Sequence, residues 1–226
     1  YGFNNPNSDG RSEFQKDIDR LLFSDAFHRL ARKTQVHPLN ENDHIHSRLT
    51  LSLETASVGR SLGEAIGLFV RDEERLPDGI QPHHLGEIVH AACLAHDIGN
   101  PPFGHSGEDA IKKWFRQHPE AINHLPAPCQ SDLTKFDGNA MSVRVMASTG
   151  FYGKGMGPSF PMLGALLKYP WPSSHDAGKD KFSFFQTEAE AIAEMAEVLG
   201  MPDLGGRYAR HPLAYLTEAA DDICYR

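Results

Sequence analysis

The sequence predicts an all-α fold. Apolar residues recur at helical spacing in several stretches, and glycine or proline follows most of them, as at helix ends. The chain contains no convincing pair of strand-like segments and no internal repeat. With 226 residues and 40% hydrophobic content it can bury one sizeable core, so we expect a single domain over residues 1–226.

The composition limits the classes of partner. A net charge of −8 argues against generic nucleic-acid binding, although it leaves room for a local basic site that binds phosphates. The chain has three cysteines, Cys93, Cys129 and Cys224. Their number is odd and their spacing is not that of metal ligands, which favours a reducing cytoplasm over a disulfide framework. No apolar run approaches the length of a membrane span, so we expect no membrane partner.

The first expected element is a helix that starts at Ser12 and ends over residues 34–38. Ser12 and Gln15 have the spacing of a capping box. The apolar stripe of this helix is Phe14, Ile18, Leu21, Leu22 and Ala26.

A second helix is expected over residues 48–70 and should be largely buried. One face carries Leu51, Thr55, Val58, Leu62 and Ala65, and it is broadened by Leu49, Leu53, Ala56 and Ile66. A third, buried helix has the stripe Leu85, Ile88, Val89, Ala92 and Ala95. It should stop at Gly99, because Pro101 and Pro102 forbid its continuation.

The rest of the chain is expected to add five helices. They cover residues 106–118, 138–148, 163–169, 187–199 and the segment from Pro212 onward, with loop over 119–132. Ser106 with Asp109, and Thr187 with Glu190, have the spacing of capping boxes. Val143 and Met146 should point inward, and Pro212 suits the first position of the last helix.

The pair His96 and Asp97 is the chemical centre of the sequence. In the last turn of a buried helix, an imidazole and a carboxylate form either a structural pair or two ligands of a cation. On the last helix, Asp221 lies beside Ala219 and Ala220, where a carboxylate is costly to bury without a cation or donors. His96, Asp97 and Asp221 would make a mixed nitrogen and oxygen site suited to Mn²⁺, Mg²⁺ or Fe²⁺ rather than to structural zinc.

Several motifs resemble those of one known family. They occupy residues 19–30, 33–36, 43–50, 95–105, 136–139, 168–170 and 218–225. Together they resemble the deoxyguanosine triphosphate triphosphohydrolase family of the HD superfamily, over residues 11–225. The resemblance implies a helical, usually oligomeric enzyme that cleaves a deoxynucleoside triphosphate to the deoxynucleoside and intact tripolyphosphate.

The resemblance also implies a role for individual residues. It makes His96, Asp97 and Asp221 metal ligands, and it places His105 and Glu108 at the family's catalytic histidine and its carboxylate partner. Gln35 matches a sugar or base contact, Arg48 and Lys168 match phosphate contacts, and Lys181 is a further candidate phosphate contact. Tyr169 and Tyr225 match residues packed against the deoxyribose. The implied cofactor is Mn²⁺ or Mg²⁺, with Fe²⁺ a further option. The implied partners are the deoxynucleotide and further copies of the chain, with nucleic acid only as a regulator.

The sequence departs from the family pattern at its first metal ligand. Where the family has histidine in Arg-Leu-Thr-His-Ser-Leu-Glu, this chain has Leu51, and His44 and His46 belong to the preceding loop. An engineered ligand knockout and a natural member with a weakened metal site are both consistent with Leu51. The family also continues beyond the last ligand, so we expect a C-terminal continuation to be missing here.

Two other functions therefore stay open beside the triphosphohydrolase. One is a catalytically silent, nucleotide-binding regulatory protein that kept the pocket but lost metal chemistry through Leu51. The other is an HD phosphohydrolase that acts on nucleoside monophosphates or cyclic dinucleotides. Arg48, Lys168 and the two tyrosines favour a triphosphate.

Overall fold

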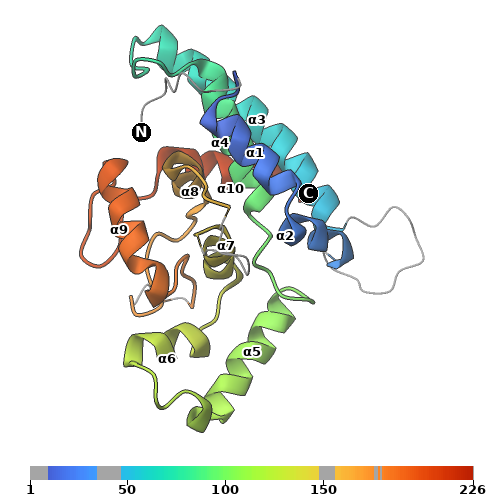
Figure 1. Ribbon diagram of the computed structural model, residues 1–226, viewed down its shortest axis with the longest axis vertical. Helices are drawn as coiled ribbons and strands as arrows, with labels where there is room; N and C mark the ends of the chain where they lie inside the picture. Colours follow the sequence, from blue (N-terminus) through green and yellow to red (C-terminus); the bar gives the residue numbers. More distant parts are fainter. Residues whose placement is uncertain (1–9, 35–46, 148–155, 176–177, 179, 226) are drawn as a thin grey trace.

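The computed structural model describes residues 10–34, 47–147, 156–175, 178 and 180–225 (Figure 1). The helices are α1 (Glu13–Leu22), α2 (Asp25–His28), α3 (Arg48–Asp72), α4 (Pro82–Ala95), α5 (His105–Gln117), α6 (Ala127–Thr134), α7 (Gly138–Ala147), α8 (Phe160–Leu166), α9 (Ala189–Val198) and α10 (Pro212–Cys224). Short 3₁₀ turns cover Arg29–Arg32, Pro119–Ala121 and Gln186–Glu188. Across the described ranges, β-pairing is limited to three isolated bridges, and the predicted all-α fold is confirmed.

Helix α4 lies at the centre of the core. Its last residues, from Ala91 to Ala95, are all 0% exposed, because α1 and α3 pack along it while α8 and α10 also contact it (Figure 1). A helix buried on every side needs an apolar sequence without a polar face, and Ala-Ala-Cys-Leu-Ala supplies one. The core thus fixes the C-terminal end of α4, where His96 and Asp97 follow.

Helices α3 and α4 approach closely along a row of glycines. Gly59, Gly63 and Gly67 are spaced four apart on α3 and are buried, and Gly86 lies on α4. A Cβ atom built on Gly63 would lie 2.6 Å from the carbonyl oxygen of Leu85 and 2.8 Å from Cα of Gly86. The backbones themselves are therefore in contact, with no room for a side chain between them.

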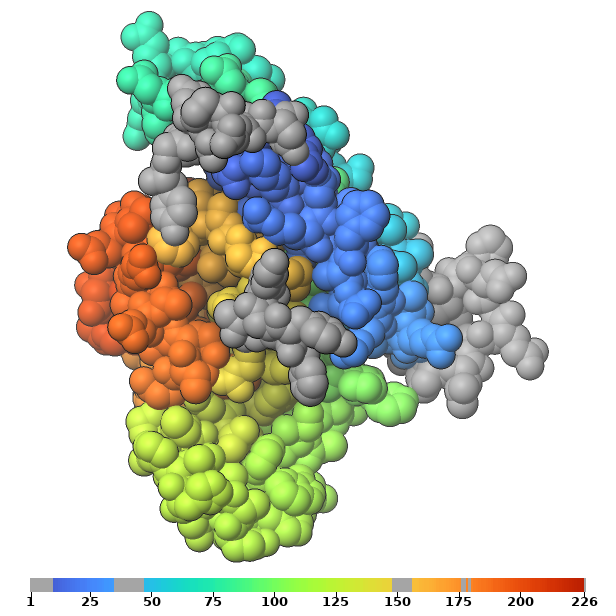
Figure 2. Space-filling model, viewed as in Figure 1, coloured from blue at the N-terminus to red at the C-terminus, as the bar shows by residue number. Residues whose placement is uncertain are grey.

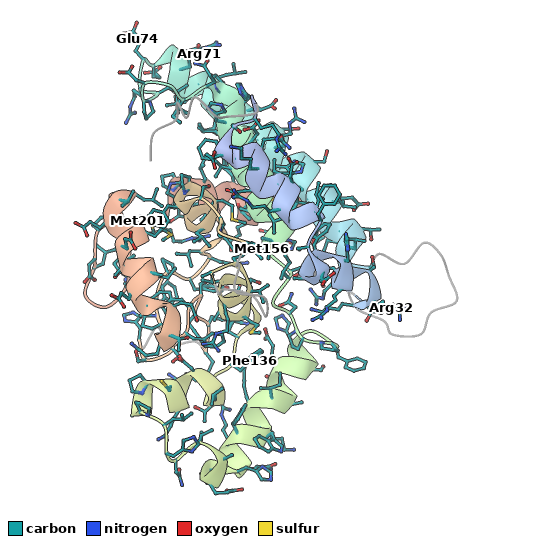
Figure 3. The ribbon with its side chains drawn as sticks, in the orientation of Figure 1. Arg32, Arg71, Glu74, Phe136, Met156 and Met201 are labelled. Atoms are coloured by element: carbon teal, nitrogen blue, oxygen red, sulfur yellow. The ribbon has the colours of Figure 1, made fainter. Side chains whose placement is uncertain are left out.

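Different segments of the chain form the two ends of the molecule. Figure 2 shows the segment with α5 and α6 as a lobe at one end of the long axis. In Figure 3, Arg71 in the last turn of α3 and Glu74 just after this helix lie at the opposite end, and Phe136 lies toward α5 and α6. None of the described helices has the length and apolar content needed to cross a membrane.

The prediction of one continuous helix after Ser12 was wrong. Helix α1 ends at Leu22, and Ser24 begins α2 by accepting a hydrogen bond from the backbone N–H of Phe27 with its hydroxyl. Serine competes well for such a cap, and the intervening Phe23 is 84% exposed. The Ser12 cap is confirmed, but the side chain of Gln15 donates to Asp19 and so does not complete a capping box.

The predicted burial of α3 was wrong in its second half. Leu51, Thr55 and Ala56 are buried, but Ala65 and Ile66 are exposed. The glycines face α4 instead, because their lack of side chains allows the closest backbone approach. The second half of α3 therefore lies at the surface, and its buried face is the one that carries Gly63 and Gly67.

Two of the predicted caps and one predicted loop were also wrong. Helix α5 starts at His105 with Gly104 at the cap position, so Ser106 lies inside the first turn. Helix α9 starts at Ala189, and the Thr187 hydroxyl donates to the side chain of Glu188 instead of capping the helix. The stretch 119–132, expected to be loop, contains a 3₁₀ turn and most of α6, which begins beside Pro126 and Pro128, where a missing N–H costs nothing.

Two helix ends were also misplaced. Helix α4 ends at Ala95, not at Gly99, so His96 caps it and Asp97 lies in the following turn. Gly99 is required by packing, because a Cβ atom there would lie 2.1 Å from the backbone nitrogen of Ser142. Helix α8 covers Phe160–Leu166 instead of 163–169, because the Ser159 hydroxyl caps it earlier.

Candidate active site

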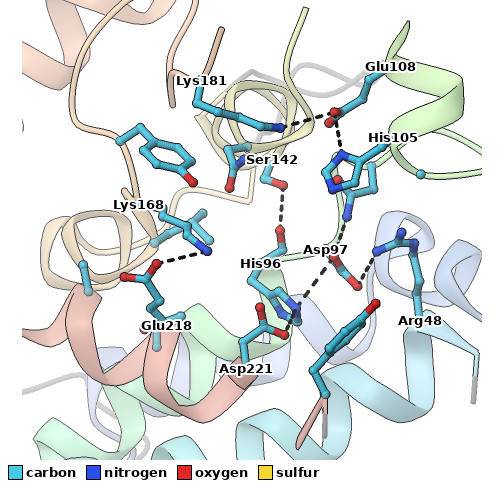
Figure 4. A pocket seen from close by; sticks show the side chains of 18 of the residues that line it. Arg48, His96, Asp97, His105, Glu108, Ser142, Lys168, Lys181, Glu218 and Asp221 are labelled. Atoms are coloured by element: carbon cyan, nitrogen blue, oxygen red, sulfur yellow. Dashed lines mark hydrogen bonds and ion pairs between the residues drawn. The ribbon is translucent and has the colours of Figure 1, made fainter. Parts of the chain in front are cut away.

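A cavity of about 510 Å³ lies where the ends of α3, α4 and α5 meet α7, α8 and α10 (Figure 4). Every predicted site residue in the described ranges lines it: Arg48, His96, Asp97, His105, Glu108, Lys168, Tyr169, Lys181, Asp221 and Tyr225. Gln35, the predicted sugar or base contact, lies outside the described residues. The fold thus brings residues from both halves of the chain into one site.

His96 is oriented by the end of α4. Its Nδ1 lies 2.7 Å from the carbonyl oxygen of Cys93, so Nδ1 carries the proton and Nε2 faces the carboxylates. Nε2 lies 3.4 Å from Oδ1 of Asp221 and 3.7 Å from Oδ1 of Asp97. Burial lowers the pKa of His96, but the two carboxylates and the hydrogen bond to Cys93 outweigh it and raise the pKa to about 9. A cation at this place would compete with a proton for Nε2.

Asp97 is paired with Arg48 across the α3–α4 contact. Nη1 of Arg48 lies 2.8 Å from Oδ2 of Asp97, and both side chains are less than 10% exposed, at 9% and 8%. The side-chain amide of Asn100 donates to Oδ1 of the same carboxylate. Oδ2 is buried and has the ion pair but no hydrogen bond of good geometry within the described part of the chain. It therefore keeps the capacity to bind a further positive group.

The donor set suits a divalent cation in its chemistry. One imidazole nitrogen and two carboxylates are the ligands that Mn²⁺, Mg²⁺ and Fe²⁺ accept, and Oδ2 of Asp97 is buried without a hydrogen bond. However, no three His, Cys, Asp or Glu side chains among the described residues are already grouped as a metal would require. Leu51 is buried on α3 next to Ser52 and one turn from Thr55, and both of these hydroxyls are buried without hydrogen-bond partners in the described structure.

His105 and Glu108 form a pair at the start of α5. Nδ1 of His105 lies 3.0 Å from Oε2 of Glu108, and the His105 side chain is exposed whereas that of Glu108 is buried. Oε1 of Glu108 accepts a hydrogen bond of 2.8 Å from the backbone N–H of Gly138. Burial raises the pKa of Glu108, but the hydrogen bonds from His105 and Gly138 and the charge of Lys181 outweigh it, so the pKa is lowered. A charged Glu108 keeps the proton of His105 on Nδ1 and leaves Nε2 open.

The two predicted lysines reach the cavity from the segment between α8 and α9. Nζ of Lys168 lies 3.2 Å from Oε1 of Glu218 on α10, and Nζ of Lys181 lies 3.4 Å from Oε2 of Glu108. Glu218 also accepts a hydrogen bond of 2.7 Å from Arg210. Burial lowers the pKa of Lys168, but Tyr169 and Glu218 outweigh it and raise the pKa, so this lysine is a fixed positive charge in the cavity.

The cavity also contains polar residues to which the sequence assigned no role. Asn100, Asn139, Ser142 and Glu218 line it. Ser142 accepts a hydrogen bond of 2.9 Å from the backbone N–H of Gly99, and so ties the turn after α4 to α7. Asn100, Asn139 and Glu218 lie inside motifs that carried the family resemblance, which is the signal that could have identified them; Ser142 had no such signal.

Comparison with known proteins shows which family model part of the chain matches. Residues 48–126 match the model of the HD domain. The chain carries an HD domain. This HD domain extends from the start of α3 to just before α6, and it contains Arg48, His96, Asp97, His105 and Glu108. Lys168, Lys181 and Asp221 lie outside the matched residues, so residues beyond the HD domain also line the cavity.

Curated relatives extend the match over almost the whole chain. The chain is 52% identical over 225 residues to a deoxyguanosinetriphosphate triphosphohydrolase-like protein of Pseudomonas aeruginosa, covering 96% of this chain and 50% of the relative. A protein of the same name from Synechocystis is 41% identical over 236 residues, covering 95% and 53%. The deoxyguanosinetriphosphate triphosphohydrolase of Yersinia enterocolitica is 34% identical over 249 residues, covering 94% and 48%. The resemblance to this family is confirmed, and the HD-domain chain spans about half the length of the curated relatives it matches.

Proposed function

We propose that the protein hydrolyses deoxynucleoside triphosphates such as dGTP to the deoxynucleoside and tripolyphosphate. The observation that carries this proposal is the composition of one cavity. It combines a histidine–carboxylate pair (His105 and Glu108) with three donors for a divalent cation and with the positive charges of Arg48 and Lys168. The names of the relatives support a deoxynucleotide as the substrate.

The proposed cofactor is Mn²⁺ or Mg²⁺, with Fe²⁺ as a further candidate. His96, Asp97 and Asp221 would hold the cation. When bound, such a cation polarises a phosphoryl oxygen and helps to activate water. The ion pair between Arg48 and Asp97 implies that the guanidinium would share or yield this carboxylate.

The side chains of the chain itself supply binding and proton transfer. In the reaction, a water oxygen bonds to the α-phosphorus, the bond from that phosphorus to the 5′ oxygen breaks, and the 5′ oxygen gains a proton. Arg48 and Lys168 would bind phosphate oxygens, and Nε2 of His105, held by Glu108, would carry a proton between water or substrate and solvent. Tyr169 and Tyr225 would pack against the deoxyribose, where a ring close to the 2′ carbon leaves no room for a ribose hydroxyl.

A regulatory role is the second candidate, and Leu51 is the observation that favours it. A buried leucine at a family metal-ligand position leaves three protein ligands, and Arg48 already neutralises one of them. In that role the chain would bind a nucleotide without cleaving it. Hydrolysis of nucleoside monophosphates or cyclic dinucleotides is less well supported, because the cavity carries several separate positive charges.

The remaining proposals concern organisation. We propose that residues 1–226 form one HD-type domain, that copies of the chain associate with one another, and that the protein acts in the cytoplasm. Nucleic acid would act only as a regulator, consistent with the net charge of −8.

Replacing Leu51 by histidine tests the proposed function. Tripolyphosphate release from dGTP with Mn²⁺, and the melting temperature with and without Mn²⁺, would be compared between the chain and Leu51→His. Leu53→His is the matched control, because it adds the same side chain to α3 at a position that is 45% exposed.

We expect Leu51→His to increase tripolyphosphate release and to melt at a higher temperature with Mn²⁺, while Leu53→His does neither. Weak metal binding by the unchanged chain is also expected, since losing one ligand should weaken affinity by about 10–100-fold or more. A melting temperature that Leu51→His lowers and Mn²⁺ does not restore would favour the regulatory role. The imidazole would then be a buried polar group without a partner, which costs about 1–3 kcal/mol.

A further inference from the structure

Two buried carboxylates share the ammonium group of Lys181. Nζ of Lys181 lies 3.4 Å from Oε2 of Glu108 and 3.4 Å from Oδ2 of Asp137. The side chains of the two acids are 3% and 0% exposed. Two buried carboxylates repel each other and lose hydration, so a shared cation between them offsets both costs. Figure 4 shows Lys181 directed at Glu108, which in turn contacts His105.

The start of α7 fixes both acids in place. Oδ1 of Asp137 accepts a hydrogen bond of 2.8 Å from the backbone N–H of Asn139, and Oε1 of Glu108 accepts one from Gly138. A Cβ atom on Gly138 would lie 2.9 Å from Oε1 of Glu108, so only glycine lets the carboxylate approach this close. Glu108 is therefore held on one side by α7 and on the other by Lys181 and His105.

We propose that Asp137 and Lys181 are positioning residues for the pair of His105 and Glu108, an assignment that rests on the proposed function. Asp137 is absent from the cavity lining of the described chain, so it acts only through Lys181 and the α7 backbone. Asp137 holds Lys181, and the ammonium of Lys181 balances the negative charge of Glu108. The ionised Glu108 then keeps the His105 proton on Nδ1. Burial lowers the pKa of Lys181, but Asp137 and Glu108 outweigh it and raise the pKa, so the ammonium keeps its charge at neutral pH.

This assignment differs from the role that the family resemblance gave to Lys181. A phosphate contact touches substrate, and its loss weakens substrate binding. A positioning residue acts through His105, and its loss slows turnover with little change in binding. The Asp137 variant distinguishes these two roles of Lys181, because the Asp137 carboxylate is buried and does not line the cavity, so it cannot reach the substrate.

The test compares kcat and KM for dGTP with Mn²⁺ in Asp137→Asn, Lys181→Met and Lys181→Arg. Asparagine keeps the oxygen that accepts from Asn139 and removes only the charge. Asp132→Asn is the matched control, because Asp132 is also buried but bonds to Ser173 and the backbone of Gln186. Melting temperatures of all variants show whether each one folds.

We expect Asp137→Asn and Lys181→Met to lower kcat about tenfold or more, as part of the roughly 10²–10⁴ that general acid–base catalysis contributes. KM and inhibition by tripolyphosphate should stay within about twofold of the unchanged chain. Lys181→Arg should recover most of kcat, the double variant should be no worse than the worse single variant, and Asp132→Asn should turn over normally. An unchanged kcat in Asp137→Asn, or a raised KM with unchanged kcat in Lys181→Met, would overturn the assignment.

A second measurement separates this inference from the proposed function. If neither the chain nor Leu51→His releases tripolyphosphate, the proposed function fails, and nitrogen NMR of the His105 ring still reports its tautomer. We expect one tautomer, with the proton on Nδ1, in the unchanged chain and in Asp132→Asn, and a mixture in Asp137→Asn and Lys181→Met. The same tautomer in all four proteins would overturn the positioning role.

Discussion

Replacing Gly63 by alanine should separate α3 from α4. The new Cβ atom would lie 2.6 Å from the carbonyl oxygen of Leu85, 2.8 Å from Cα of Gly86 and 2.9 Å from its nitrogen. All three are backbone atoms of α4, and the best carbon contact distance is roughly 3.5–4.0 Å. The helices must therefore move apart by close to an ångström, because no side chain can rotate away.

Two opposing effects set the size of this change. Alanine favours a helix over glycine by about 1 kcal/mol, which alone would stabilise α3. Forcing an extra carbon into a packed contact costs about 1–3 kcal/mol, and more where the backbone must shift. We expect overpacking to win, with the free energy of unfolding lowered by about 1–2 kcal/mol. The movement should also weaken the ion pair between Arg48 and Asp97, which joins the start of α3 to the turn after α4.

Urea unfolding would measure this loss, with Gly59→Ala as the comparison. A Cβ atom on Gly59 would meet Sγ of Cys93 at 2.5 Å, a side-chain atom that Cys93→Ala removes. We therefore expect Cys93→Ala to reduce the cost of Gly59→Ala, and Leu85→Ala to leave the cost of Gly63→Ala unchanged. A Gly63→Ala protein as stable as the unchanged chain would refute the claim that backbone contact sets the separation of α3 and α4.

Three further variants test the site and its surroundings. His105→Ala, made in the Leu51→His background, should lower turnover of dGTP by about 10²–10⁴-fold while nucleotide binding is kept, and equal turnover would remove His105 from the mechanism. Arg48→Met should lower the free energy of unfolding by about 3–5 kcal/mol in urea, because it removes the guanidinium that lies 2.8 Å from the buried Asp97 carboxylate. Burial lowers the pKa of His211, so its contribution to stability is complete above its ordinary pKa of about 6.5 and is lost as the pH falls below that value. His211→Asn, which can still cap α10, should therefore make stability less sensitive to pH between about 8 and 5, and an unchanged dependence in urea would contradict this.

The fold class could be predicted from the sequence because apolar residues recur at helical spacing in most of the helices. The errors fall where a local choice is decided by tertiary packing. Ser24 and Ser12 have the same chemistry, but only the folded structure shows that the chain breaks at Phe23. In the second half of α3, apolar residues indicated the wrong buried face, because glycines contribute little to a hydrophobic pattern and yet allow the closest approach.

The candidate site could be predicted where a motif marked the residue. All described members of the predicted set line one cavity, which neither composition nor spacing alone would have shown for residues as distant as Arg48 and Asp221. The ion pairs within the site could not be predicted from the sequence. Nothing in the pattern indicated that Arg48 would pair with Asp97, or that Asp137 and Lys181 would surround Glu108, because such pairs depend on side-chain positions across separate segments of the fold.

The pairing of Arg48 with Asp97 has a consequence for the order of assembly during synthesis. Synthesis proceeds from the N-terminus, so α3 and α4 emerge before α10 delivers Asp221 or the α8–α9 segment delivers Lys168. Until then Asp97 would be an acid in a forming core without its later neighbours. Because Arg48 comes from the adjacent helix, the early pair of helices can bury this carboxylate as a neutral unit. The rest of the site can then dock on a framework that is already electrically balanced.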